Sequence, residues 1–110
     1  MLMSDAKYMR VFQAVADEKR FEILKLLQSG AKTVGEIADS LGYLQPQTSK
    51  HLKILHQAGL VRVEAVANKR IYHLEKDGFT VLGDWLSSYI QRWEDQLDRL
   101  DAYLKEEEES

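Results

Sequence analysis

The sequence predicts a mainly helical domain that carries one β-hairpin, and two changes in its apolar pattern lead to this prediction. Apolar residues recur at helical spacing as far as Gly59, alternate with polar residues over 60–74, and then return to helical spacing. The 110 residues are enough for one domain, and a hydrophobic fraction of 45% allows that domain to bury a core. We therefore treat residues 1–110 as a single domain.

The composition excludes several kinds of site and of protein. There are no cysteines, so this chain cannot form a disulfide, a thiolate metal site or a cysteine nucleophile. No apolar run approaches the roughly 18 residues of a membrane span, and the N-terminal stretch lacks the core of a signal peptide. We expect a cytoplasmic protein without membrane insertion.

The net charge of −3 is divided unevenly along the chain. Residues 1–75 contain 11 Lys and Arg against 8 Asp and Glu, whereas residues 76–110 contain 4 against 10. A basic region that precedes an acidic end indicates a polyanionic partner, although an ordinary surface with an acidic tail would give the same pattern.

Two helices are predicted before residue 31. Ser4 is a suitable N-cap for a helix that ends near Ala16, and Asp17 is a suitable N-cap for the helix that follows. Gly30 can adopt the positive φ that ends the second helix. The first helix has apolar residues at helical spacing, namely Tyr8, Val11, Phe12 and Val15.

A short helix and a second helix close behind it are predicted over residues 33–58. Thr33 and Glu36 have the spacing of a capping box, and Gly42 ends the first of these helices. Pro46 has the fixed φ that suits the first turn of the second helix. This order is typical of a helix-turn-helix.

A β-hairpin is predicted over residues 60–74. Val61, Val63 and Ala65 alternate with polar residues, and the sequence Ala-Asn-Lys-Arg makes the turn. Polar and basic side chains thus lie at or next to the tip, namely Asn68, Lys69 and Arg70. A helix-turn-helix followed by such a hairpin predicts a winged helix-turn-helix.

The longest helix is predicted over residues 79–105, with an acidic tail at 106–110. From Leu86 onward its apolar positions are spaced by four, three, four, three and four residues, which is the pattern of a coiled-coil seam. A helix of about 40 Å can wrap its own core or pack against a second copy of the chain. We favour the second arrangement, with residues 1–17 and 79–105 as dimerisation helices, because the aromatic residues of the last helix would otherwise be partly exposed. The predicted dimer interface comprises Tyr8, Phe12, Leu86, Tyr89, Ile90, Trp93, Leu97, Leu100 and Leu104.

Three segments of this sequence resemble the ArsR/SmtB-type bacterial repressors. The segments are "AVADEKRFEILKLLQSG", "TVGEIADSLGYLQPQTSKHLKILHQAGLV" and "VANKRIYHL", which together cover about residues 14–74. The C-terminal "WLSSYIQRWEDQLDRLDAYL" is similar to a long last helix found in a subset of that family. The resemblance implies a homodimer that binds double-stranded operator DNA and represses transcription.

The second helix of a helix-turn-helix enters the major groove by its N-terminal half, and the side chains in this half can form hydrogen bonds. Gln pairs with adenine and Lys with guanine or phosphate, while the hairpin suits the DNA backbone or the minor groove. Each of these residues could instead be an ordinary surface residue, and Thr48 could be a packing residue. The predicted DNA-binding residues are Gln45, Gln47, Thr48, Ser49, Lys50, His51, Lys53, Asn68, Lys69 and Arg70.

Leu44 departs from the family pattern, which often has serine as the N-cap of the DNA-reading helix. A leucine side chain cannot accept a hydrogen bond from the first turn, a loss of about 1 kcal/mol. Pro46 offsets part of this loss because it removes one of the unpaired donors. The start of the helix is therefore open to a shift of one residue.

Many members of this family release DNA when a metal binds, through cysteines near the helix-turn-helix or through Asp, His and Glu on the last helix. This chain has no cysteine, and its last helix has no histidine. Asp95 and Arg99 on that helix form an ordinary pair four residues apart. We expect no metal site and no cofactor, and regulation by an inducer of unknown identity, either a protein partner or an apolar ligand near the last helix.

A protein-interaction module that uses the same fold without reading DNA is the alternative function. Four basic residues favour DNA binding because they have no evident purpose in such a module, namely Lys50, Lys53, Lys69 and Arg70. An enzyme is not expected, since the sequence has no nucleophile–base pair at a known spacing and no glycine-rich phosphate loop.

Overall fold

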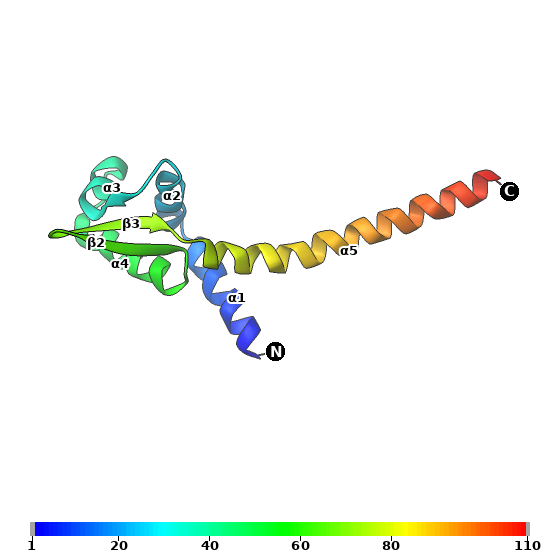
Figure 1. Cartoon of the computed structure of the whole chain (residues 1–110), viewed down its shortest axis with the longest axis horizontal. Helices are drawn as coiled ribbons and strands as arrows, with labels where there is room; N and C mark the ends of the chain where they lie inside the picture. The colour runs from blue at the N-terminus through cyan, green and yellow to red at the C-terminus, as the bar shows by residue number, and fades with distance from the viewer. Residues whose placement is uncertain (1, 110) are drawn as a thin grey trace.

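The computed structural model describes residues 2–109, with side chains from residue 5 onward. The chain is mainly helical with one β-hairpin, as the sequence predicts (Figure 1). The elements in chain order are α1 (Leu2–Val15), α2 (Glu18–Leu27), β1 (Lys32–Thr33), α3 (Val34–Leu41), α4 (Gln45–Gln57), β2 (Val61–Val66), β3 (Lys69–Leu74) and α5 (Lys76–Glu109).

Local signals in the sequence explain most of the helix ends. The Asp17 side chain accepts from the Arg20 amide at the start of α2, and Thr33 and Glu36 form both hydrogen bonds of a capping box at the start of α3. Gly42 ends α3 in the left-handed conformation with φ 70°. These three predictions are confirmed.

Two predicted helix ends are wrong by a few residues. The helix α1 begins at Leu2, so Ser4 lies within its first turn instead of capping it. The C-cap of α2 is Gln28, whose amide reaches the carbonyls of the last turn, and Gly30 lies two residues beyond it. Gly30 has the predicted positive φ, at 137°, and its amide donates to the Leu27 carbonyl at 3.2 Å, so it closes the end of α2 from two residues beyond the C-cap.

The hairpin joins a third, very short strand to form an antiparallel sheet in the order β1-β3-β2. Val61 pairs with Leu74 at the base of the hairpin, and Val66 pairs with Lys69 next to the turn. The strand β1 was not predicted; it pairs Lys32 with Tyr72. Since β1 has only two residues, it shows no alternating pattern from which it could be predicted.

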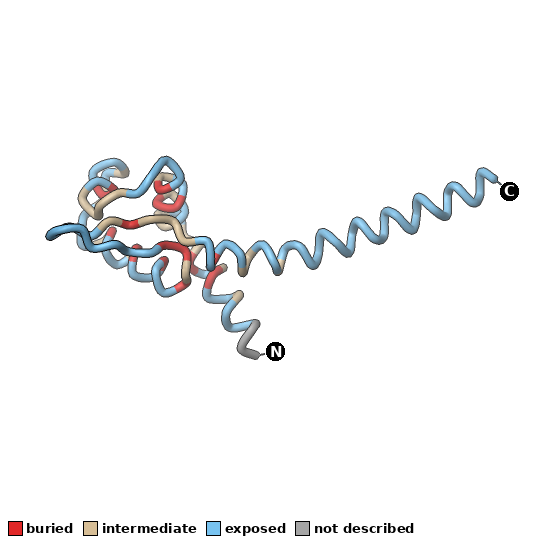
Figure 2. The backbone as a smooth tube through the Cα atoms, viewed as in Figure 1, coloured by how far each residue is buried: buried red, intermediate tan, exposed pale blue. Residues whose placement is uncertain are grey.

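The core lies where α1, α2, α3 and α4 meet the base of the hairpin. The largest fully buried side chains are Ile23, Ile37, Thr48, Leu52, Leu55, Leu60 and Val61. Figure 2 shows that the buried positions gather in this part of the chain, whereas most of α5 is exposed.

The helix α5 begins earlier and ends later than predicted, at Lys76 and Glu109 in place of 79 and 105. With 34 residues it is about 51 Å long at 1.5 Å per residue. The radius of gyration is 20.0 Å, compared with about 13 Å for a compact domain of this length. The C-terminal part of α5 therefore extends away from the core (Figure 1).

Candidate nucleic-acid interface

The first turn of α4 has no side-chain N-cap and is stabilised by hydrogen bonds from Thr48 within the helix. Leu44 is the N-cap and makes no side-chain hydrogen bond, as its sequence predicts. The Thr48 amide and the Thr48 hydroxyl both donate to the Leu44 carbonyl, each at 2.9 Å. Pro46 lies in this turn and lacks an N–H that would need a partner. The start of α4 at Gln45 is thus defined by Thr48 and Pro46.

Most of the predicted DNA-contacting side chains of α4 face solvent. Gln47 and His51 are partly buried, and Thr48 is fully buried. The exposed members are Gln45, Ser49, Lys50 and Lys53. Nine of the ten predicted DNA-binding residues are therefore accessible to a partner in this conformation. Thr48 is not accessible and packs between α4 and the core.

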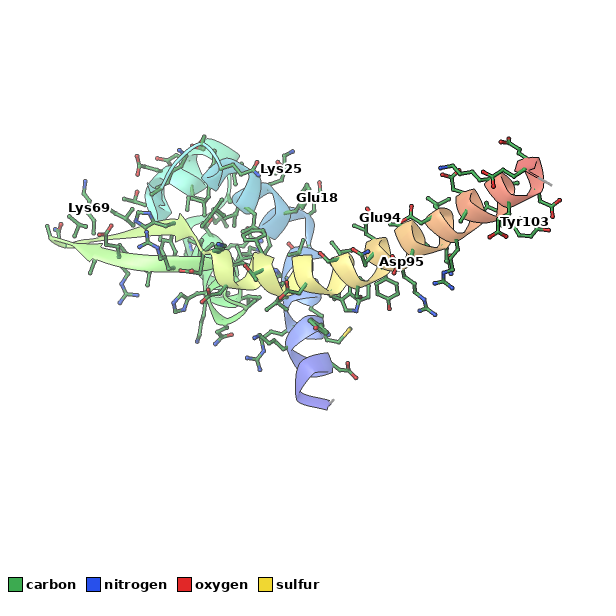
Figure 3. All side chains as sticks on the ribbon, turned by 45° about the vertical axis from the view of Figure 1, so that its right-hand side comes forward. Glu18, Lys25, Lys69, Glu94, Asp95 and Tyr103 are labelled. Carbon is green, nitrogen blue, oxygen red and sulfur yellow. The ribbon has the colours of Figure 1, made fainter. Side chains whose placement is uncertain are left out.

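The polar residues at the tip of the wing are exposed. The hairpin turns at Ala67 and Asn68, and Ala67 adopts a positive φ of 56°. Asn68, Lys69 and Arg70 are all exposed, and Figure 3 shows Lys69 near the free end of the hairpin. The tip of the wing and the C-terminal end of α5 lie at opposite ends of the molecule (Figure 1).

A polar cluster beneath α4 connects it to α1 and α2. Arg20 donates from Nε to the Ala14 carbonyl at 2.8 Å and from Nη2 to the Gln13 carbonyl at 3.1 Å. Its Nη1 lies 3.2 Å from Nδ1 of His51. Asp17 lies beside the same guanidinium, with Oδ2 at 3.9 Å from Nη1. Arg20 therefore contacts the end of α1 and the middle of α4 at once.

The cluster shifts the pKa values of two of its members. Burial lowers the pKa of His51 below its ordinary 6.5, and the positive charges of Arg20 and Lys19 lower it further, against an opposing effect from Asp17. The backbone amide of Arg20 holds the pKa of Asp17 below its ordinary value. The lowered pKa favours the neutral form of the His51 imidazole.

The end of α4 and the start of α5 approach each other closely. The Gly78 amide donates to the Gly59 carbonyl at 2.7 Å. A Cβ on Gly78 would lie 2.8 Å from that oxygen and 2.9 Å from the Ala58 carbonyl oxygen, which is too close. Glycine is thus required at residue 78 by packing.

The predicted dimer-interface residues of α5 lie along an exposed apolar face. Trp93 and Leu97 are 65% and 64% exposed, and five others are about half exposed, namely Leu86, Tyr89, Ile90, Leu100 and Leu104. On α1, Tyr8 and Phe12 are partly buried, and Phe12 packs edge-on against Trp85 with ring centroids 4.9 Å apart. Within a single chain, α1 therefore packs against the N-terminal part of α5, next to the start of this apolar face.

Sequence reasoning assigned no role to Arg20 or to Gly78. Arg20 pairs locally with Asp17 in the Asp-x-x-Arg segment at residues 17–20, but the partners of its side-chain hydrogen bonds lie 6, 7 and 31 residues away and leave no local pattern. Gly78 directly precedes the helix predicted over 79–105, where a glycine indicates an ordinary turn, so the sequence gives no signal for its close contact with residues 58 and 59.

Two other kinds of site are absent from the described residues. No three His, Asp or Glu side chains there lie together in a way that could hold a metal ion. No helix within 2–109 combines the length and the hydrophobicity that a membrane span needs.

Comparison with known proteins identifies the family. Residues 17–63 match the family described as bacterial regulatory protein, arsR family. The HTH-type transcriptional regulator Rv2034 of Mycobacterium tuberculosis is 38% identical over 83 residues, which cover 76% of this chain and 78% of that protein. The transcriptional repressor SdpR of Bacillus subtilis is 34% identical over 90 residues, covering 79% of this chain and 97% of SdpR.

A solved structure agrees with this result. A homodimeric winged helix-turn-helix DNA-binding domain from Mycobacterium bovis matches with a TM-score of 0.64 and 25% identity, over 79% of this chain and 84% of that one. The sequence matches and the fold together show that this chain belongs to the ArsR family of winged helix-turn-helix transcriptional regulators.

Proposed function

We propose that this protein is a homodimeric repressor that binds operator DNA with α4 in the major groove and the wing against the DNA backbone or the minor groove. The observation that carries the proposal is the row of exposed or partly buried polar and basic side chains that begins α4, together with the exposed basic tip of the wing. Both belong to the winged part of the chain, away from the free end of α5 (Figure 1).

Each side chain in this row has a role that fits its chemistry. Gln45 and Gln47 can form paired hydrogen bonds with adenine, and Lys50 can donate to guanine or to phosphate. Ser49 can donate to either a base or a phosphate. Lys53 lies one turn further from the helix start and is suited to phosphate.

His51 also fits a phosphate contact. Because an arginine can only donate, Nδ1 of His51 accepts the hydrogen bond from Arg20, and Nε2 carries the ring hydrogen. Nε2 has no hydrogen-bond partner within residues 5–109 and is not a buried unpaired atom. Arg20 thus orients a neutral N–H donor on α4.

The dimer is proposed to form through α1 and the apolar face of α5. Large apolar side chains follow one another along α5, each about half exposed or more, which is unusual for a soluble monomer. A second copy of the same face is the partner we propose, since the seam repeats every three or four residues as in paired helices. The relative from Mycobacterium bovis is described as homodimeric, and this supports the proposal.

Repression without a metal signal is the regulatory part of the proposal. The match with SdpR covers nearly the whole length of SdpR, and SdpR is named a repressor. The inducer we propose is a protein partner or an apolar ligand that binds near α5. Adding stoichiometric zinc or nickel to the operator complex should leave it intact, and release of the DNA would contradict this part.

A charge reversal tests the DNA-binding proposal. The operator is first selected from genomic fragments, and its affinity is then measured for the double variant Lys50→Glu, Arg70→Glu. We expect binding to be abolished with the dimer intact, because both groups would then repel phosphate. The control, Lys25→Glu with Lys76→Glu, makes the same change in charge outside the proposed interface and should bind DNA nearly as the wild type does. Unchanged DNA affinity in the first variant would favour a protein-interaction module instead.

A further inference from the structure

Leu44 is 74% exposed, more than any other large hydrophobic residue that the structure describes. A single exposed leucine is ordinary on a protein surface. This one, however, occupies the N-cap of α4, where Ser, Thr, Asp or Asn would accept a hydrogen bond from the helix. Leucine therefore stabilises neither the core nor the helix end at this position.

The backbone that carries Leu44 is held on both sides. Its carbonyl accepts two hydrogen bonds from Thr48, which is fully buried. The preceding residue, Tyr43, packs against the core, and the Lys19 ammonium lies 5.2 Å from the centre of its ring. The Leu44 side chain thus projects from a fixed point and not from a mobile loop.

We infer that Leu44 is a specificity residue that contacts the C5-methyl group of a thymine in the major groove. The N-terminal end of a recognition helix is the part that reaches the base edges. Leu44 stands immediately before Gln45, the first residue of α4. The thymine methyl is the apolar group that bases present in this groove, so an aliphatic side chain there selects thymine. This inference rests on the proposed function, since it needs α4 to lie in the groove.

The experiment removes the methyl group alone. Each thymine of the selected operator is replaced in turn by deoxyuridine, which keeps every hydrogen bond and lacks only the C5-methyl. At one position in each half-site, we expect the wild type to bind the deoxyuridine operator about four-fold more weakly than the thymine operator. This is the loss expected for one buried methyl group. At that position, Leu44→Ala should bind thymine and deoxyuridine equally well.

Two further variants separate this contact from general damage. Leu44→Ser supplies a capping hydroxyl, so it should unfold at a higher temperature than the wild type while losing the preference for thymine. Lys50→Ala should bind all sites more weakly and keep the four-fold difference. If Leu44→Ala and Leu44→Ser retain the difference, or if the wild type shows none, the assignment of Leu44 is wrong. If no DNA sequence is selected at all, the proposed function fails, and the role of Leu44 fails with it.

Discussion

The guanidinium of Arg20 and the imidazole of His51 are joined across 3.2 Å, from Nη1 to Nδ1, although the two residues are 31 positions apart in the chain. The same guanidinium reaches two carbonyls at the end of α1. One side chain thus connects a proposed dimerisation helix, α1, to the proposed DNA-reading helix, α4. Arg20 thus adds a polar connection between α1 and α4 to the apolar core that the two helices share.

Replacing Arg20 should therefore be costly. Arg20→Ala leaves the carbonyls of Gln13 and Ala14 and the Nδ1 atom of His51 without their donor, and we expect the free energy of unfolding to fall by about 1–3 kcal/mol. Arg20→Lys should recover only part of this loss, because an ammonium cannot reach the three acceptors in the fork geometry of a guanidinium. Urea titration measures both variants. The control is Lys25→Ala on the same helix; equal losses in control and variant would contradict the role of Arg20.

The stability of the protein should fall as the pH drops below about 6.5. Burial lowers the pKa of His51 in the folded chain, so the unfolded chain takes up its proton first, and acid favours unfolding in this window. His51→Asn can still present an acceptor to Arg20 but does not titrate. Urea midpoints measured from neutral pH downward should decline less steeply for this variant, and identical slopes would refute the prediction.

The affinity for DNA should depend steeply on salt. Contacts to phosphate release counterions, so the logarithm of the affinity should fall linearly with the logarithm of the salt concentration. Lys69→Ala should reduce the slope by about 1, whereas Gln47→Ala should leave the slope unchanged and weaken discrimination between bases. Fluorescence anisotropy at several salt concentrations gives both slopes. An interaction that does not respond to salt would argue against the proposed interface.

Charges placed on the apolar face of α5 should separate the dimer. Trp93 and Leu97 are adjacent on this face and well exposed in the single chain. The variant Trp93→Glu, Leu97→Glu should be monomeric in sedimentation equilibrium and should bind the two-part operator much more weakly. The control variant Gln91→Glu, Ala102→Glu adds the same charge away from the seam and should remain dimeric. A dimer that survives the first variant would place the interface elsewhere.

Two glycines of α5 should respond in opposite directions to alanine. Gly78→Ala introduces a Cβ that would lie 2.8 Å from a carbonyl oxygen, and we expect it to destabilise the fold by about 1–3 kcal/mol. Gly83 has no atoms within 4 Å of such a Cβ, so Gly83→Ala should stabilise the helix by about 0.5–1 kcal/mol. Thermal unfolding of the two variants, compared at the same protein concentration, should show melting temperatures on either side of that of the wild type.

The features predicted best from the sequence are those determined by neighbouring residues. The capping box of Thr33 and Glu36, the N-cap Asp17 and the left-handed Gly42 each act within one helical turn. The order of helices and hairpin followed from changes in apolar spacing. Features that depend on distant parts of the chain were missed, because local patterns do not encode them.

Three examples show this limit. The strand β1 exists because Tyr72, forty residues along the chain, pairs with Lys32. The bonds of Arg20 depend on how three helices meet, and the need for glycine at residue 78 depends on the carbonyls of Ala58 and Gly59. At the candidate site, the residues of α4 and the wing are predicted from their type and position. The sequence leaves open whether Thr48 packs or contacts DNA, and its complete burial depends on how α4 lies on the core.

The close approach of Gly59 and Gly78 holds the start of α5 against the winged part of the chain. In the proposed dimer, the direction in which α5 leaves the winged part sets the separation of the two recognition helices. The hydrogen bond from Gly78 to Gly59 and the packing of Phe12 on Trp85 both hold the start of α5, so in the proposed dimer these contacts would set the spacing between the halves of an operator, whereas side chains of α4 would select the bases within each half. Substitutions along the start of α4 can thus change which sequence is read without changing how far apart its two halves must lie.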